Sequence, residues 1–292
     1  MSAPLVELRD VRKHYPLRGG FFGSVRGTVK AVDGVSLAIA AGETVGLVGE
    51  SGCGKSTLAR LCLRLLEPSA GDVLFQGRSL LGLAPRELRA LRREMQIVFQ
   101  DPYGALNPGM RVERIIAEGL DIHRLGTRAE RRARVAELLA LVGLPPEAAR
   151  RYPHEFSGGQ RQRIGIARAL AVRPHFVVAD EAVSALDVSI QAQVLNLFQD
   201  LRRQLGLTML FIAHDLRIIE HISDRVAVMY LGRIVEVGSR DVIYSAPRHP
   251  YTRTLLAAVP VADPRQRAER MRRRTVMGGD VPSPVNPPQG CA

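Results

Sequence analysis

A glycine-rich segment between two apolar runs constrains this chain of 292 residues more than any other feature. The run Thr44–Val48 before it predicts a buried strand. After it, apolar residues recur at i, i+3, i+4 and i+7, which predicts an amphipathic helix that Pro68 ends. The segment itself fits the pattern G-x-x-x-x-G-K-[ST] and consists of Gly49, Glu50, Ser51, Gly52, Cys53, Gly54, Lys55, Ser56 and Thr57.

The composition of this segment suits a polyphosphate anion. Glycines let the backbone curl until several N–H groups face one anion, and the helix that begins near Lys55 adds the positive end of its dipole. Lys55 would place its charge between the β- and γ-phosphates, and Ser56 would offer a hydroxyl to Mg²⁺. A glycine-rich turn without a ligand is the alternative, but one of only three lysines in the chain falls where the pattern needs it. The segment therefore predicts binding of ATP with Mg²⁺.

Two adjacent carboxylates follow a second apolar run. Phe176–Ala179 predicts a core strand, and Asp180 and Glu181 stand at its end. A carboxylate at the C-terminal end of a strand beside a phosphate loop suits binding of Mg²⁺ from the outer coordination shell or through water. Glu181 would then face the γ-phosphate and polarise the attacking water as general base. An acidic pair after an apolar run is a weak signal alone, but beside a phosphate loop it predicts hydrolysis of ATP.

A serine followed by two glycines opens a further predicted helix. The residues are Ser157, Gly158, Gly159 and Gln160, preceded by Phe156. Ser157 suits an N-cap, and the glycines expose N–H groups at the positive end of the helix. Taken alone this is a helix start, and it is equally a second anion site. Because one nucleotide would not need both sites from the same chain, the pair of sites hints at a dimer.

Strand and helix signals alternate along the rest of the chain. Strands are expected at residues 5–12, 35–39, 96–99, 208–213, 226–230 and 234–237, the last two as a hairpin. Residues 17–29 and 101–109 are rich in turn formers and predict loops. A helix is expected from Ile190 to Leu201, with Asp187 or Ser189 as its N-cap. The alternation predicts an α/β sandwich with a largely parallel sheet. After Pro260 an arginine- and proline-rich tail is expected to be extended.

Charge and composition narrow the class of protein. The net charge is +12, and all but three of the 41 basic residues are arginines. A basic balance can mean a nucleic acid or an anionic membrane as partner, but the scattered arginines without interleaved aromatics favour a solvated basic surface. No run approaches the about 18 consecutive apolar residues of a membrane-spanning helix. The three cysteines have neither disulfide-framework nor metal-site spacing, which agrees with a reducing cytoplasm.

The motifs stand in an order that resembles the ATP-binding subunits of ABC transporters. The phosphate loop, Phe156–Gln160 and Asp180-Glu181 follow one another as in that family, over about residues 4–260. The resemblance implies an α/β fold of the ABC-type P-loop ATPases, with a RecA-like core, an antiparallel β subdomain and a helical subdomain at about 101–165. It implies an ATPase domain over 1–245 and a C-terminal extension of oligopeptide-transporter type over 246–292.

The same resemblance assigns roles to further residues. Tyr15 is similar to the aromatic that stacks on adenine, and Gln100 to the glutamine that contacts Mg²⁺ and the attacking water. His214 resembles the histidine that contacts the γ-phosphate, and Ser184–Asp187 the loop that crosses the dimer interface. The chain departs from the family pattern at two positions. Phe156 stands where leucine is usual and Ala182 where proline is usual, and neither change removes a functional group.

Three segments resemble the oligopeptide and dipeptide importers, a group that includes nickel and glutathione importers. They are residues 183–197, residues 248–252 and the proline-rich residues 281–288. The glycine-rich insertion at 17–29 resembles the F-type subunit, which pairs with a D-type ATPase. In that group the tail often carries further cysteines. Cys291 is alone here and does not predict a cysteine-ligated cluster.

The resemblance implies a peripheral ATPase on the cytoplasmic side of the cell membrane. Its partners would be a second ABC ATPase subunit (D-type, or a second copy of the chain), two transmembrane permease subunits and an extracytoplasmic substrate-binding protein. ATP would lie between the phosphate loop of one ATPase and Ser157–Gln160 of the other. An ATPase acting on nucleic acid or ribosomes is one alternative, although the chain lacks the second core or coiled-coil insertion usual there. An exporter, or a transporter of lipid or metal, is the other.

Overall fold

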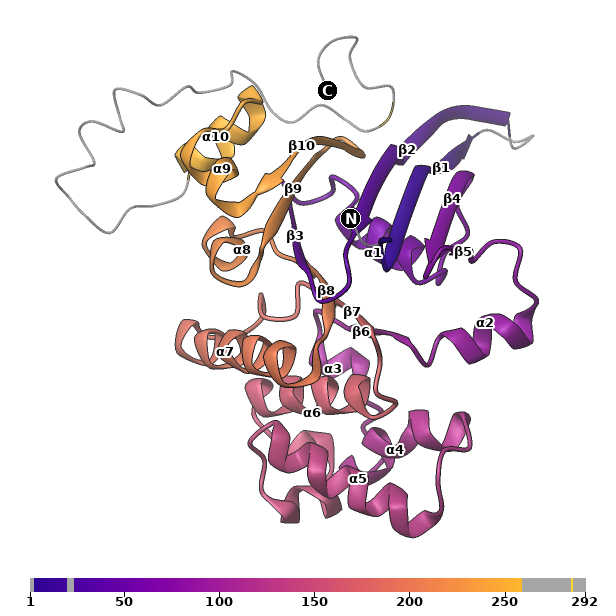
Figure 1. The fold of residues 1–292 in the computed structure, drawn as a ribbon, viewed down its shortest axis with the longest axis vertical. Coiled ribbons are helices and arrows are strands. Elements are labelled where there is room, and N and C mark those ends of the chain that lie inside the picture. Colours follow the sequence, from indigo (N-terminus) through magenta and orange to yellow (C-terminus); the bar gives the residue numbers. More distant parts are fainter. Residues whose placement is uncertain (1–2, 20–23, 259–284, 286–292) are drawn as a thin grey trace, which may run out of the picture. The chain divides into compact units, whose positions relative to one another are not determined.

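The computed structural model describes residues 3–19, 24–258 and Val285 of the chain. It divides into two compact units (Figure 1). Unit 1 combines Met1–Leu81 with Ile212–Ala292, and unit 2 is Gly82–Phe211. Among the described residues, no helix has both the length and the apolar character needed to cross a bilayer.

An antiparallel sheet of four strands in the order β2-β1-β4-β5 forms one part of unit 1. Its strands are β1 (Val6–Gly19), β2 (Ser24–Ile39), β4 (Ala70–Phe75) and β5 (Arg78–Ser79). The pairing of β1 with β2 extends from Val6↔Ile39 to Gly19↔Ser24, with several register shifts. The expected loop at 17–29 is therefore wrong, because most of it pairs in this two-stranded arm (Figure 1). Residues 20–23 lie outside the described part.

The second part of unit 1 places the phosphate loop. Strand β3 (Thr44–Val48) is buried throughout and pairs in parallel with β9 (Arg225–Tyr230). Strand β9 pairs antiparallel with β10 (Arg233–Ser239), which confirms the predicted hairpin. The helices of this unit are α1 (Lys55–Cys62), α8 (Leu216–Ile222), α9 (Arg240–Ser245) and α10 (Pro250–Ala258).

Helix α1 ends earlier than the sequence predicts. It stops at Cys62, six residues before Pro68, and Arg64 then adopts a left-handed backbone with φ of 46°. The Arg64 guanidinium donates a hydrogen bond to the Leu80 carbonyl oxygen (2.6 Å). The helix therefore ends at a turn that the contact of Arg64 with Leu80 stabilises, before the chain reaches the proline.

Unit 2 contains three further strands and a group of helices. Strand β6 (Met95–Val98) pairs in parallel with β7 (Phe176–Asp180), and β8 (Thr208–Ile212) follows β7 in strand order. The parallel pairs of β6 with β7 and of β3 with β9 agree with the expected sheet. The helices are α2 (Pro85–Leu91), α3 (Pro102–Ala105), α4 (Val112–Ile122), α5 (Arg128–Leu141), α6 (Gly158–Leu170) and α7 (Val188–Leu205), with the short turns η1 (Pro146–Arg150) and η2 (Pro153–Glu155) (Figure 1).

The predicted extension 246–292 begins within the described part of unit 1. It contains α10, and beyond residue 258 only Val285 is described, in an isolated bridge to Val29 of β2. The expected extended tail otherwise falls outside the described residues. The boundaries at 245 and 246, and the helical subdomain at about 101–165, stay predictions.

Candidate functional site

The phosphate loop joins β3 to α1, and close backbone packing explains two of its glycines. A Cβ on Gly49 would lie 2.1 Å from the Met229 carbonyl oxygen of β9. Gly54, the N-cap of α1, has φ of 107°, and a Cβ there would lie 2.0 Å from the Ala31 carbonyl oxygen. A left-handed backbone pressed against another strand admits only glycine. The loop is thus held in the curled shape that directs N–H groups toward an anion.

Lys55 lies inside this loop with its side chain only 4% exposed. Its ammonium donates hydrogen bonds to the carbonyl oxygens of Gly49 (2.7 Å) and Glu50 (2.8 Å). Ser56 and Thr57 follow in the first turn of α1 and are half-buried. The structure therefore places a cation and two hydroxyls at a helix N-terminus, which is the arrangement that binds phosphate.

The turn between β9 and β10 supports the loop from one side. The Gly232 N–H donates to the Cys53 carbonyl oxygen (3.0 Å), and the Asp33 N–H of β2 donates to the Gly232 carbonyl oxygen (2.8 Å). Burial raises the pKa of the Cys53 thiol. A thiol that stays protonated is a poor nucleophile, so Cys53 serves the loop through its backbone and its packing.

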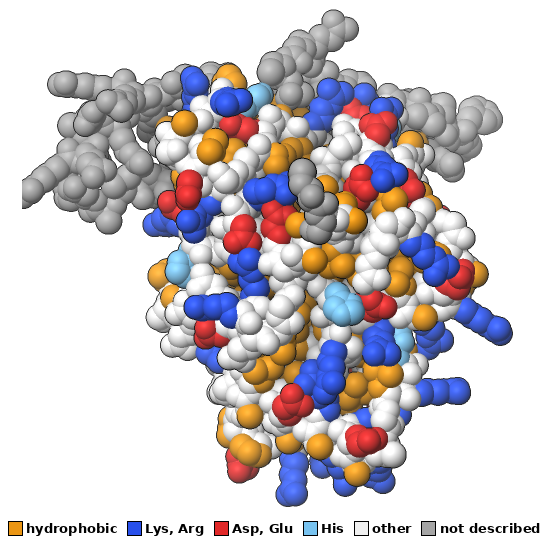
Figure 2. Space-filling model, viewed as in Figure 1, with side chains coloured by type: hydrophobic (Ala, Val, Ile, Leu, Met, Phe, Trp, Pro, Cys, Tyr) orange, Lys and Arg blue, Asp and Glu red, His pale blue; other side chains and the backbone are white. Residues whose placement is uncertain are grey.

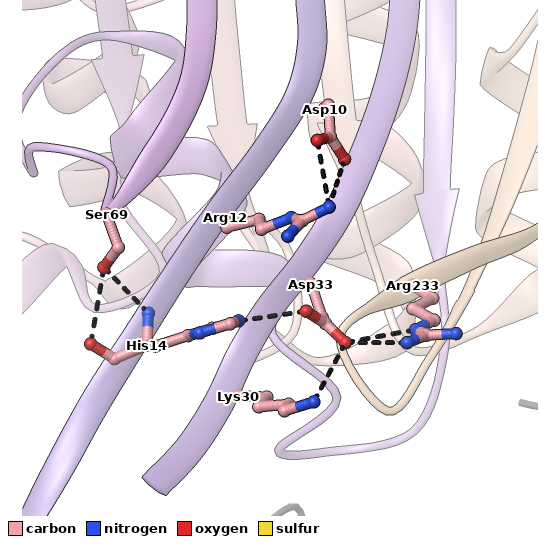
Figure 3. Close-up of polar contacts among 7 residues, drawn as sticks. All are labelled: Asp10, Arg12, His14, Lys30, Asp33, Ser69 and Arg233. Carbon is pink, nitrogen blue, oxygen red and sulfur yellow. Dashed lines mark hydrogen bonds and ion pairs between the residues drawn. The ribbon is translucent and has the colours of Figure 1, made fainter.

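Tyr15 lies on β1, beside a cluster of charged side chains. Its ring is 38% exposed, and the Lys13 ammonium lies 5.2 Å from the ring centroid. On the neighbouring residue, His14 Nε2 lies 3.0 Å from Asp33 Oδ1 (Figure 3). The partly exposed ring is available for stacking. The contact of His14 with Asp33 holds this part of β1 against β2.

Asp33 is the centre of that cluster (Figure 3). Its carboxylate accepts a hydrogen bond from Arg233 of β10 (2.8 Å) and lies 3.7 Å from the Lys30 ammonium. Burial alone would raise the pKa of this carboxyl, but the hydrogen bonds from Arg233 and His14 hold it below its usual range. One carboxylate thus links β1, β2 and the β9–β10 turn.

His214 lies between β8 and α8, and its side chain is exposed. The next residue, Asp215, caps α8 by accepting a hydrogen bond from the Arg217 N–H (2.9 Å). The Ala213 N–H donates to the Leu47 carbonyl oxygen of β3 (3.3 Å). This bond sets His214 one residue away from the strand that leads into the phosphate loop.

In unit 2, Ser157 caps α6 as the sequence predicts. Its hydroxyl accepts from the Gln160 N–H (3.3 Å), and the Gln160 side-chain oxygen accepts from the Ser157 N–H (3.0 Å). This reciprocal pair leaves the N–H groups of Gly158 and Gly159 as the donors of the first turn. A Cβ on Gly159 would lie 2.3 Å from Ile190 Cγ2, so the motif packs tightly on α7.

The acidic pair ends β7. Asp180 is 6% exposed, and Glu181 follows with a left-handed backbone, φ of 49°. The Glu181 carbonyl oxygen accepts hydrogen bonds from the Ser184 N–H (3.1 Å) and hydroxyl (2.9 Å). Ala182 is buried in the same turn. The turn that the usual proline would stiffen is therefore fixed by Ser184.

Gln100 follows β6 and is exposed. The residue before it is anchored, because the buried Gln162 amide donates to the Phe99 carbonyl oxygen (3.3 Å). Asp101 then caps α3 by accepting from the Tyr103 N–H (2.8 Å). The segment expected to be a loop at 101–109 thus contains a short capped helix.

A hollow of about 890 Å³ lies in unit 2 among α4, α5 and η1. Six arginines and two carboxylates line it, and they surround an apolar floor that includes Ala117, Val135 and Leu139. Figure 2 shows basic side chains around hydrophobic ones over the part of unit 2 where Figure 1 draws α4 and α5. The arginines are Arg111, Arg114, Arg128, Arg131, Arg132 and Arg150. Because six arginines outnumber two carboxylates, the lining of the hollow carries a net positive charge.

The predicted site residues fall into two groups. Unit 1 carries the phosphate loop, Tyr15 and His214, and unit 2 carries Gln100, Ser157–Gln160 and Asp180-Glu181. Sequence reasoning missed two residues that support the first group, Asp33 through the neighbour of Tyr15 and Tyr251 by direct contact with the loop. Asp33 gave no signal, and Tyr251, which accepts a hydrogen bond from the Glu50 N–H, was noticed only as part of a subgroup motif. No local pattern identifies either one, because their partners are distant in the sequence.

A phosphate loop between β3 and α1, with a buried lysine at its centre, defines a nucleotide-binding protein of the P-loop class. The ABC transporter family model matches residues 32–184, and a model of the oligopeptide/dipeptide transporter C-terminal region matches residues 235–292. The chain belongs to the ABC transporter family.

Similar proteins and structures agree with this assignment. A putative peptide import ATP-binding protein of Brucella ovis is 55% identical over 99% of this chain and 88% of its own length. The oligopeptide transport ATP-binding protein AppF of Bacillus subtilis is 54% identical over 98% and 87%. Among solved structures, the ATP-binding cassette MJ0796, a dimer in a post-hydrolysis state bound to ADP and Pi, is 30% identical over 80% of this chain and 98% of its own, with a TM-score of 0.72.

Proposed function

We propose that this chain is the ATP-binding and ATP-hydrolysing subunit of an ABC importer, and that the imported solute is an oligopeptide or dipeptide. The observation that carries the solute class is the second match, in which residues 235–292 fit the oligopeptide/dipeptide transporter C-terminal region. Relatives described as peptide import ATP-binding proteins support it over nearly the whole chain. Nickel or glutathione import is the alternative within the same group.

In this proposal each group of site residues has one task. Gly49–Thr57 binds the triphosphate, and Tyr15 stacks on adenine. Glu181 is the general base for the attacking water, with Gln100 and His214 contacting the water and the γ-phosphate. The turn that fixes the main chain of Glu181 supports this role, because a general base works only when it is held in position.

The metal in this proposal is Mg²⁺. The candidate donors are the Ser56 hydroxyl, the Asp180 carboxylate and the Gln100 amide oxygen. An oxygen-only donor set with few protein ligands fits Mg²⁺, which keeps several waters and binds nucleotide phosphates directly. The metal would neutralise charge that develops on the phosphates. Among the described residues, no cluster of three or more His, Cys, Asp or Glu offers a different metal site.

We further propose that Ser157–Gln160 acts on the nucleotide of a second ATPase subunit, either a D-type partner or another copy. The glycine pair offers free N–H donors at a helix N-terminus, and one chain already has a phosphate loop. The prediction concerns Ser157→Ala, which removes the capping hydroxyl. Mixed with Lys55→Ala chains, it is expected to regain ATP hydrolysis that neither variant shows alone, because each mixed dimer keeps one intact composite site.

A matched control separates this effect from the loss of a helix cap. Thr127 caps α5 through the same reciprocal pair, with Glu130, so Thr127→Ala loses an equivalent cap away from the motif. Each loss costs about 1 kcal/mol of helix stability. Thr127→Ala should therefore hydrolyse ATP without complementation. Inactive mixtures of Ser157→Ala with Lys55→Ala, and with every candidate D-type partner, would count against action between subunits.

The membrane-embedded permease subunits are the proposed partners of the arginine-lined hollow. Its charge and its apolar floor suit an amphipathic segment with acidic side chains. This would hold the ATPase peripherally at the cytoplasmic side of the membrane. Arg132 is exposed on α5, and Arg132→Glu is expected to lower the stimulation of ATP hydrolysis by vesicles carrying the permeases by about tenfold or more, since a like charge would then face the partner.

The test of the proposed function uses the same vesicles. Wild type should be stimulated by them and not by DNA or RNA, and binding of ATP to Arg132→Glu in solution should be unchanged. Arg203→Glu makes the same charge reversal at an exposed residue of α7, outside the hollow, and should keep full stimulation. Stimulation by nucleic acid in place of vesicles would favour an ATPase acting on nucleic acid, and equal behaviour of the two variants would contradict the docking surface.

A further inference from the structure

The C-terminal part of unit 1 makes a direct contact with the phosphate loop. Tyr251 in α10 is 2% exposed, and its hydroxyl accepts a hydrogen bond from the Glu50 N–H at 3.1 Å. The centroid of its ring lies 4.3 Å from the ring centroid of Tyr230, the last residue of β9. Burial raises the pKa of the Tyr251 hydroxyl well above its ordinary value, so the group stays neutral. Two residues that are 201 positions apart are thus joined at the loop.

This contact acts on the same residue that Lys55 holds. Tyr251 binds the N–H of Glu50, while the Lys55 ammonium binds its carbonyl oxygen and that of Gly49. A triphosphate competes with those carbonyls for the ammonium, because phosphate oxygens make stronger, charge-assisted hydrogen bonds. When Lys55 turns to the phosphate, Glu50 keeps two bonds, from its own N–H to the Tyr251 hydroxyl and from the Cys53 N–H (3.3 Å) to its carbonyl oxygen.

A single carboxylate places Tyr251. Glu236 of β10 accepts hydrogen bonds from the N–H groups of Arg248 (2.8 Å) and His249 (3.1 Å). His249 Nδ1 in turn accepts from the Tyr251 N–H (3.2 Å). The Glu236 carboxylate therefore binds the main chain just before α10 begins, at the helix end where a negative charge is favourable.

We propose that Tyr251 is a positioning residue that holds the phosphate loop in its binding shape, and that Glu236 and the start of α10 set nucleotide affinity through it. The inference rests on the proposed binding of ATP and extends it, by giving the C-terminal segment a role in the nucleotide site. A loop already fixed in its bound shape loses less conformational freedom on binding, which raises affinity without touching the ligand.

The test is an equilibrium titration of the full chain with ATP in the presence of Mg²⁺. Tyr251→Phe removes only the hydroxyl, and the dissociation constant for ATP is expected to rise about three- to tenfold, the range that one ordinary hydrogen bond yields. Tyr244→Phe is the matched control. The half-buried Tyr244 hydroxyl also bonds to the main chain, in its case by donating to the Leu216 carbonyl oxygen, but Tyr244 lies on α9 and has no bond to the loop.

Two further comparisons distinguish positioning from a general loss of stability. The melting temperatures of the nucleotide-free Phe variants should fall by similar amounts, while only Tyr251→Phe weakens ATP binding. Glu236→Gln should weaken binding in the same direction and add little in the double variant with Tyr251→Phe, because both act through one contact. If Tyr251→Phe binds ATP as wild type does, or if the two effects add, the inference is overturned. A wild-type chain that does not bind ATP would instead overturn the proposed function.

Discussion

Replacement of Glu181 by Gln is expected to leave ATP binding intact and to lower turnover by about a few hundredfold or more, the loss typical of a positioned general base. The amide is nearly the same size as the carboxylate, so the turn after β7 should keep its shape. That turn depends on the Glu181 main-chain oxygen, which accepts from Ser184, and the substitution does not alter it. What disappears is the capacity to take a proton from water.

The measurement pairs two quantities on the same preparation. Equilibrium titration gives the affinity for ATP, and phosphate release in the presence of the partner vesicles gives turnover. Asp200→Asn is the control, because it neutralises another carboxylate of unit 2, on the exposed face of α7. Turnover close to wild type in Glu181→Gln would remove the proposed role of Glu181 while leaving ATP binding untouched.

The second large effect is expected at Lys55. Lys55→Ala should abolish tight binding of ATP, because the variant loses a buried cation at the centre of the loop. Hydrogen bonds from a charged donor contribute about 1.5–3 kcal/mol each, and an ammonium can give more than one to the phosphates. The expected weakening is therefore about a hundredfold or greater in a calorimetric titration.

The control for Lys55→Ala keeps the helix and changes the charge elsewhere. Arg60 is exposed in the last turn of α1, so Arg60→Ala removes a positive charge from the same helix. It should bind ATP with nearly wild-type affinity. An unchanged affinity in Lys55→Ala would overturn the assignment of Gly49–Thr57 as the phosphate loop.

Segments whose burial is uniform were predictable from the sequence. Thr44–Val48 is predicted and observed as one strand, because an apolar run of this length, with a turn before it and a glycine-rich segment after it, is typical of a buried strand. The start of α6 was equally clear, because Ser157 and Gln160 cap it within four residues. The identity of the phosphate loop followed for the same reason, since its chemistry is contained in adjacent residues.

Features that depend on distant partners were not predictable. Residues 17–29 looked like a loop because their glycines suggest turns, whereas the ends of β1 and β2 pair there and satisfy each other's backbone groups. The end of α1 depends on Arg64, whose partner Leu80 lies 16 residues away. Tyr251 is the extreme case, since its contact with Glu50 joins a helix near the C-terminal end of the described chain to a loop near the start.

The three lysines have a practical consequence for experiments on this protein. Lys13 lies over the Tyr15 ring, Lys30 beside Asp33, and Lys55 inside the phosphate loop. Reagents that acylate primary amines react with lysine and spare arginine, which supplies nearly all the remaining positive charge. Fluorescent labelling or amine coupling to a sensor surface would therefore attach, apart from the N-terminus, at or near the residues proposed to bind the nucleotide. Such chemistry would report on ATP occupancy, or block it, and an affinity tag is the safer point of attachment, because Cys53 also lies in the phosphate loop.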